Sequence, residues 1–140
     1  MNLKIKKLTP NAKIPEYACQ DDAGFDLFAT ENIEIKPQER VQIKTGLAMQ
    51  IPPGFVGLIW DKSGLSHNQG LKTLGGVVDS GYRGEIKVGL VNLSTENYTI
   101  EAGHKVAQMI IQKKELCEIE EVTELDESDR GEGGFGSTGK

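Results

Sequence analysis

The sequence has little cysteine, few aromatic residues and no long apolar run. It contains 2 cysteines in 140 residues, and aromatic residues make up 6% of it. Cys19 and Cys117 are isolated from each other and from both histidines, which excludes a disulfide framework and a cysteine-histidine metal cluster. We expect two buried thiols in a reducing compartment.

Positive charge is also scarce, with 16 Lys and Arg against 21 Asp and Glu and a formal net charge of -5. This balance argues against a nucleic-acid polymer as the main partner, because such partners usually meet a basic face. A small phosphorylated ligand stays compatible with it, since local arginines and backbone amides bind phosphate on acidic proteins too. Residues 1–6 lack an apolar signal core and no run is long enough to cross a bilayer, so we expect a cytoplasmic protein without a membrane segment.

What the sequence does contain is short segments with the two-residue alternation of β-strands, separated by Gly and Pro turns. No sustained 3.6-residue stripe appears, although residues 63–70 suit a short helical piece. We expect Trp60 in the core and a turn at Thr45-Gly46. The pattern predicts one all-β domain, as a sandwich, jelly roll or small barrel. The expected strands cover residues 3–5, 33–35, 41–43, 55–60, 85–92, 98–100, 106–112 and 117–122.

An acidic stretch leads into a glycine-rich tail near Asp126, so we place the packed body at 1–125 and the tail at 126–140. Such a tail does not hold itself folded, because its glycines raise the entropy of the free chain. Arg130 offers a forked donor for phosphate oxygens and Phe135 offers a face for a base. The tail is either a flexible lid over a nucleotide or a solvated chain end.

The centre of the chain places Asp79 and Tyr82 three residues apart in a glycine-punctuated hairpin, residues 75–84. Asp79 is a candidate to orient and deprotonate a water, with Tyr82 as a flat wall beside it. The structural alternative makes Asp79 a turn former and Tyr82 a half-buried strand residue.

Three further segments carry polar groups. Residues 61–64 combine a cation, a hydroxyl and a glycine, which suits a phosphate cradle, although the spacing matches no Walker A loop. Residues 22–27 place two acids around a glycine, and Gln108 stands in an apolar strand. His67 and His104 have no partner at metal-ligand spacing, so we expect structural or surface roles for them.

Taken together and in order, five segments resemble the trimeric deoxyuridine triphosphatase (dUTPase) family. The family pattern is Ala-Gly-x-Asp-Leu, Arg-Ser-Gly, Gly-x-x-Asp-x-x-Tyr-x-Gly, Ala-Gln and Arg-Gly-x-Gly-Gly-Phe-Gly-Ser-Thr-Gly. These segments stand here at residues 23–27, 62–64, 76–84, 107–108 and 130–139, which spans nearly the whole chain.

The resemblance implies a jelly-roll-like β fold and a homotrimer with three active sites between subunits. It also implies Mg²⁺-dependent cleavage of dUTP to dUMP and pyrophosphate, which limits uracil in DNA and supplies dUMP for thymidylate synthesis. By position, Asp79 resembles the residue that orients the attacking water, and Tyr82 the ring that packs on deoxyribose. The uracil-binding residues that the resemblance implies are Thr73, Gly76, Val77 and Val78 in the hairpin and Lys87 on the strand that leaves it.

The resemblance places the phosphates at Lys62, Ser63, Gly64 and Gln108, and it places Asp26 near the waters of the metal. In the tail, Phe135 would stack on uracil, and Arg130, Gly136 and Ser137 would close on the β- and γ-phosphates. The family usually has arginine where this chain has Lys62, and lysine cannot form the same bidentate fork. We expect activity to persist with an altered phosphate affinity, because the charge remains.

Two other functions compete with this interpretation. A deoxycytidine triphosphate deaminase shares parts of the central hairpin, but this chain has Gly89 where that enzyme's catalytic glutamate is expected, and the deaminase lacks the glycine-rich tail. A catalytically weak relative could instead serve as a nucleotide-gated module that binds a protein partner.

Overall fold

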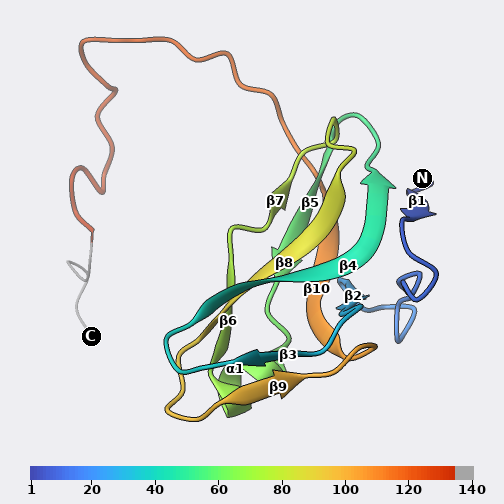
Figure 1. Cartoon of the computed structure of the whole chain (residues 1–140). Helices are drawn as coiled ribbons and strands as arrows, with labels where there is room; N and C mark the ends of the chain where they lie inside the picture. The colour runs from blue at the N-terminus through green and yellow to red at the C-terminus, as the bar shows by residue number, and fades with distance from the viewer. Residues whose placement is uncertain (135–140) are drawn as a thin grey trace.

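The computed structural model describes residues 1–134, which form ten β-strands and one short helix. Two four-stranded antiparallel sheets pack against each other, and a separate two-stranded pair lies at one end of the molecule (Figure 1). This is the all-β architecture that the alternation predicts. No helix in the described part is long and apolar enough to cross a membrane.

The first sheet has the order β1-β4-β8-β6, and the second has the order β2-β10-β5-β7. The strands of the first sheet are β1 (Lys4–Lys7), β4 (Arg40–Gln50), β8 (Glu85–Asn92) and β6 (Leu71–Leu74). Those of the second are β2 (Phe25–Phe28), β10 (Lys105–Lys113), β5 (Phe55–Trp60) and β7 (Val77–Val78). The separate pair consists of β3 (Ile33–Ile35) and β9 (Tyr98–Ile100), and helix α1 spans Ser63–Gln69.

The core lies between the two sheets and follows from the alternation. In β8, Ile86, Val88 and Leu90 are buried while Lys87 is exposed. Leu27 and Met109 of the second sheet are fully buried against them. Because successive strand residues point to opposite faces, each sheet contributes one apolar face to this core.

Several sequence predictions are confirmed, including the strands at Phe55–Trp60, Glu85–Asn92 and Tyr98–Ile100 and the helical piece after Lys62. The turn predicted at Thr45-Gly46 is wrong, because both residues lie inside β4 at a β-bulge. Gly46 has a φ of 65°, and Thr45 is buried and donates a hydrogen bond from Oγ1 to the Ile86 carbonyl at 2.6 Å. The bulge therefore bends the strand without ending it.

Three burial or strand predictions are also wrong. Trp60 is 51% exposed, because it lies on the outer face of the second sheet at the end of β5. Cys19 and Cys117 are both exposed, so neither is a buried thiol. Residues 117–122 form no strand and are exposed, since no sheet edge of this chain lies beside them (Figure 1).

Asp61 links the end of β5 to β6 and so ties the second sheet to the first. Its carboxylate pairs with Lys72 and accepts a hydrogen bond from the Thr73 N–H at 2.7 Å. Burial raises the pKa of the Asp61 carboxyl, but the hydrogen bonds from Lys72 and Thr73 and the Lys72 charge outweigh burial, so the pKa lies below its ordinary value.

This lowered pKa predicts a pH-dependent stability. The ionised Asp61 carboxylate contributes fully to the free energy of unfolding above the ordinary aspartate pKa of about 3.9. This contribution is lost as the pH falls through the lower pKa of the folded state. Asp61→Asn should therefore reduce the free energy of unfolding by about 1–2 kcal/mol at neutral pH, and the difference from wild type should shrink in acid. Urea unfolding of both proteins at several pH values measures it, with Asp126→Asn in the exposed segment as the control. A difference that stayed constant into acid would contradict this account.

Candidate active site

The central segment, residues 74–85, crosses from one sheet to the other and is not a paired hairpin. β6 pairs with β8 in the first sheet, whereas β7 pairs with β5 in the second. The crossing occurs at Gly75 and Gly76, whose φ angles are 68° and 103°. A Cβ on Gly76 would lie 2.7 Å from the Ile59 carbonyl oxygen, and the Ile59 N–H donates to the Gly76 carbonyl at 2.8 Å. Glycine is needed here both for its conformation and for this close approach.

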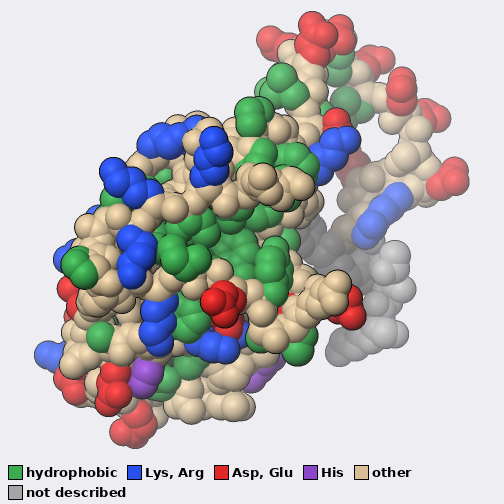
Figure 2. Space-filling model, turned by 90° about the vertical axis from the view of Figure 1, so that its right-hand side faces the viewer, with side chains coloured by type: hydrophobic (Ala, Val, Ile, Leu, Met, Phe, Trp, Pro, Cys, Tyr) green, Lys and Arg blue, Asp and Glu red, His purple; other side chains and the backbone are tan. Residues whose placement is uncertain are grey.

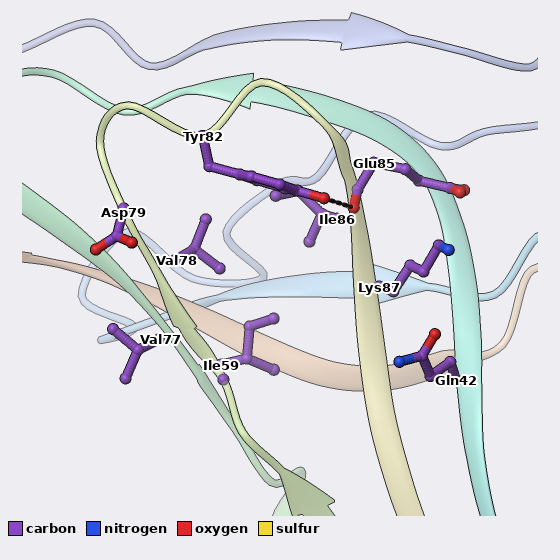
Figure 3. A pocket seen from close by; sticks show the side chains of 10 residues that line it. Gln42, Ile59, Val77, Val78, Asp79, Tyr82, Glu85, Ile86 and Lys87 are labelled. Atoms are coloured by element: carbon purple, nitrogen blue, oxygen red, sulfur yellow. Dashed lines mark hydrogen bonds between the residues drawn. The ribbon is translucent and has the colours of Figure 1, made fainter.

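The crossing segment forms one wall of a pocket of about 380 Å³ (Figure 3). Six of the sequence-predicted residues line it: Gly76, Val77, Val78, Asp79, Tyr82 and Lys87. Gln42, Ile59, Glu85 and Ile86 also line the pocket and were missed, because in the sequence they look like ordinary strand residues. The pocket thus draws its walls from both sheets.

The Tyr82 ring lies across the top of this pocket, and its hydroxyl donates a hydrogen bond to the Glu85 carbonyl at 3.1 Å (Figure 3). The ring also lies over Gly84, where an added Cβ would overlap the Tyr82 hydroxyl and lie 2.6 Å from Cζ. Gly84 therefore has no room for a side chain while Tyr82 keeps this position. Asp79 is exposed at the pocket rim, and its carbonyl accepts the Tyr82 N–H at 3.1 Å.

A second pocket, of about 340 Å³, brings together the other polar segments. Asp26 and Gln108 are direct cross-strand partners on β2 and β10, and Gln108 Nε2 donates to the Asp61 carbonyl at 2.8 Å. The start of α1 supplies the opposite side. The sequence-predicted residues that line this pocket are Asp26, Lys62, Ser63, Gly64 and Gln108.

Asp26 is the electrostatic centre of the second pocket. It is only 4% exposed, and its two carboxylate oxygens accept hydrogen bonds from the ammonium groups of Lys62 at 2.5 Å and Lys105 at 2.7 Å. Burial raises the pKa of Asp26, but the hydrogen bonds and charges of the two lysines outweigh it, so the pKa is lowered and the group is ionised at neutral pH.

The carboxylate of the second pocket suits a Mg²⁺ ion that is bound together with a polyphosphate. The described residues contain no group of three or more His, Cys, Asp or Glu side chains that could hold a metal by themselves. Mg²⁺ typically keeps several waters and binds through one or two carboxylates together with substrate phosphates. Asp26 supplies one such carboxylate, and the two ammonium groups beside it suit the phosphates that would accompany the metal.

The two pockets share no lining residue, so one chain does not unite all the predicted site residues. Thr73 lies on β6 and lines neither pocket. Arg130 is exposed, and its Nε donates to the Gly133 carbonyl at 2.8 Å. Phe135, Gly136 and Ser137 lie outside the described residues, so their predicted roles stay predictions.

At Gly89, an added Cβ would lie 2.9 Å from the Leu74 carbonyl oxygen, which leaves no room for the glutamate of a deaminase.

Comparisons with known proteins agree with the motifs. Residues 10–139 match the family model described as dUTPase. The deoxyuridine 5'-triphosphate nucleotidohydrolase of Clostridium kluyveri is 48% identical, over 99% of each chain, and that of Nautilia profundicola is 49% identical, over 100% of each. The dUTPase of Staphylococcus bacteriophage 80alpha with dUpNHpp has a TM-score of 0.93 at 33% identity, over 99% of each chain. A mutant dUTPase from phage phi11, described as coordinating a structural Mg(II) ion, has a TM-score of 0.85 at 29% identity, over 91% of this chain and 100% of that one.

The close approach at Gly76 gives a prediction for the crossing segment. Gly76→Ala should destabilise the protein by at least about 2 kcal/mol, because the new methyl group collides with the Ile59 backbone and the φ angle is unfavourable. Gly75→Ala is the matched control: it carries the φ strain alone, with open space around its Cβ, and should cost about 1 kcal/mol. Urea unfolding measures both, and equal losses would contradict the steric explanation.

Proposed function

The chain belongs to the dUTPase family and hydrolyses dUTP to dUMP and pyrophosphate, and we propose how its residues divide that reaction. The first pocket binds the deoxyuridine and the second binds the triphosphate with its Mg²⁺. The observation that carries this proposal is the collection of six predicted residues, from Gly76 to Lys87, around one pocket. Hydrolysis of dUTP keeps uracil out of DNA and yields dUMP for thymidylate synthesis.

The first pocket selects the base and the sugar. Backbone groups of residues 76–78 recognise the uracil edge, and cytosine is rejected because its donors and acceptors are exchanged. We expect the crossing segment to exclude thymine, because the methyl group of that base would collide with it. Tyr82, held over Gly84, packs on the deoxyribose where a 2′-hydroxyl would collide with the ring.

Asp79 orients the attacking water and accepts its proton as the water oxygen bonds to the α-phosphorus. The bond from the α-phosphorus to the bridging oxygen breaks at the same time, and pyrophosphate leaves with that oxygen. The exposed position of Asp79 at the pocket rim supports this role, because water and the phosphate chain can both reach it.

The second pocket holds the phosphates through the Lys62 ammonium, the Ser63 hydroxyl, the Gly64 N–H and the Gln108 amide. Bound Mg²⁺ supplies electrostatic stabilisation of the charge that develops on the phosphate oxygens. Asp26 is the residue that would hold this metal, through its waters. Arg130 and the tail residues Phe135, Gly136 and Ser137 close over the nucleotide as a lid formed by residues 126–140.

We propose a homotrimer in which each site combines pockets from different subunits. Exposed apolar side chains in three regions support assembly, and the gathered patch among them is of the kind that marks protein–protein contacts. Figure 2 shows hydrophobic side chains gathered on the β1 and β2 side of the molecule, with Lys and Arg around them. The outer face of the second sheet exposes Trp60 and Val77, and the segment after β10 exposes Leu116, Ile119 and Leu125.

The role of Asp79 is tested by Asp79→Asn. We expect hydrolysis of dUTP to fall by at least about 1,000-fold, because the amide cannot accept the proton of the water, while the affinity for dUpNHpp stays within about threefold of wild type. Pyrophosphate release and calorimetric titration measure the two quantities. An equal loss of binding and hydrolysis would make Asp79 a structural residue.

The role of Tyr82 is tested through Gly84. Wild-type protein should release pyrophosphate from dUTP and not from dCTP, dTTP or UTP. Gly84→Ala should displace the Tyr82 ring and reduce the preference for dUTP over UTP, measured as the ratio of kcat/KM, by about tenfold or more. Gly81→Ala, in the same loop with open space around its Cβ, should leave this ratio unchanged. A preference that survived in Gly84→Ala would contradict the role of Tyr82, and wild-type protein that released no pyrophosphate would overturn the proposed function.

A further inference from the structure

Lys105 is a charged residue of the second pocket that the family motifs did not identify. Its ammonium group donates to Asp26 Oδ2 at 2.7 Å, while Lys62 donates to Oδ1 on the other side of the same carboxylate. The Asp26 side chain is almost fully buried, whereas the Lys105 side chain is 50% exposed at the pocket. Lys105 therefore reaches the centre of the pocket from its rim.

A β-bulge in β10 brings Lys105 to this position. Lys105 pairs with Phe28 and Ala107 with Leu27, so Val106 has no partner on β2. In a regular strand, residues 105 and 108 would point to opposite faces of the sheet, since they are three positions apart. The extra residue in the bulge shifts the alternation by one position, so Lys105 points to the same face as Gln108 and Asp26. Bulges commonly redirect side chains in this way beside active sites.

We propose that Lys105 is a positioning residue of the phosphate site, which acts through Asp26 to leave the Lys62 ammonium available for the triphosphate. This inference rests on the proposed function. With Lys62 alone, the charge of Asp26 would neutralise the only cation of the cradle. With Lys105 as a second partner, the cluster of one carboxylate and two ammonium groups carries a net charge of +1.

Another carboxylate at the pocket makes this balance sensitive. Asp22 lines the rim, where its Oδ2 accepts the Cys19 N–H at 2.9 Å, and its charge acts on Lys105. The four charged groups that line the pocket therefore sum to zero with Lys105 and to -1 without it. Without Lys105, the one remaining ammonium group of the pocket, Lys62, is paired to the buried Asp26 carboxylate, and the strongly anionic triphosphate meets acid charge that nothing offsets.

The experiment compares Lys105→Met, Lys105→Arg and a control on the same strand, Lys113→Met, whose side chain is 75% exposed outside the pocket. Calorimetric titrations use dUpNHpp with Mg²⁺ and dUMP as the two ligands. Lys105→Met should weaken the affinity for dUpNHpp by about tenfold and the affinity for dUMP by less than about threefold. In the dUTPase assay, KM should rise while kcat stays within about threefold of wild type. Lys105→Arg should restore dUpNHpp affinity to within about threefold of wild type, and Lys113→Met should leave it unchanged.

A double mutant shows whether Lys105 acts through Asp26. In an Asp26→Asn background, Lys105→Met should weaken the affinity for dUpNHpp by only about twofold, because the Asp26 carboxylate on which Lys105 acts is already absent. Additive losses would overturn the proposal in favour of a direct phosphate contact. The proposal also fails if Lys105→Met binds dUpNHpp like wild type, or if dUMP and dUpNHpp are weakened equally. Wild-type protein that neither bound dUpNHpp nor cleaved dUTP would overturn the proposed function and this inference together, whereas a normal wild type with an unaffected Lys105→Met overturns this inference alone.

Discussion

The passage of the chain between the two sheets at Gly75-Gly76 is the constraint on which the first pocket depends. The Gly76 carbonyl accepts the Ile59 N–H, which fixes the segment to the edge of the second sheet, and the chain then returns to the first sheet at Glu85. The pocket therefore has one wall on each sheet, and the packing of the core holds its width. Since interiors are close-packed, the buried residues of these walls, Ile59, Val78 and Ile86, are held by the core.

Alternation in the sequence predicts most strands because each buries one face, but it does not show what a strand pairs with. Residues 117–120 alternate apolar and acidic side chains as β3 does, yet residues 117–122 form no strand, since hydrogen bonding to a sheet edge decides the outcome. β7 was missed because a strand of two residues is too short to show a periodic pattern. Its pairing with β5 follows from the crossing at Gly76.

The residues of the site also differ in whether the sequence predicts them. Asp79, Tyr82 and Asp26 are predicted from the resemblance of five ordered motifs to the dUTPase family, because each segment by itself also suits a turn or a strand. Glu85 and Lys105 carry no such signal, since a charged residue at a strand end is normally a solvated one. Lys105 belongs to its pocket only through the bulge at Val106, and a bulge changes the face of a side chain without changing the composition of the segment.

An acidic protein that binds a triphosphate must place its few cations where they act at contact distance. The net charge of -5 acts over distances at which salt screens it, because the Debye length is about 8 Å at physiological ionic strength. The two lysines that flank Asp26 act within a partly buried pocket, where screening is weak. Local charge balance, and not the charge of the whole chain, thus decides whether the second pocket accepts an anion, and the buried carboxylate between two lysines is where this chain sets that balance.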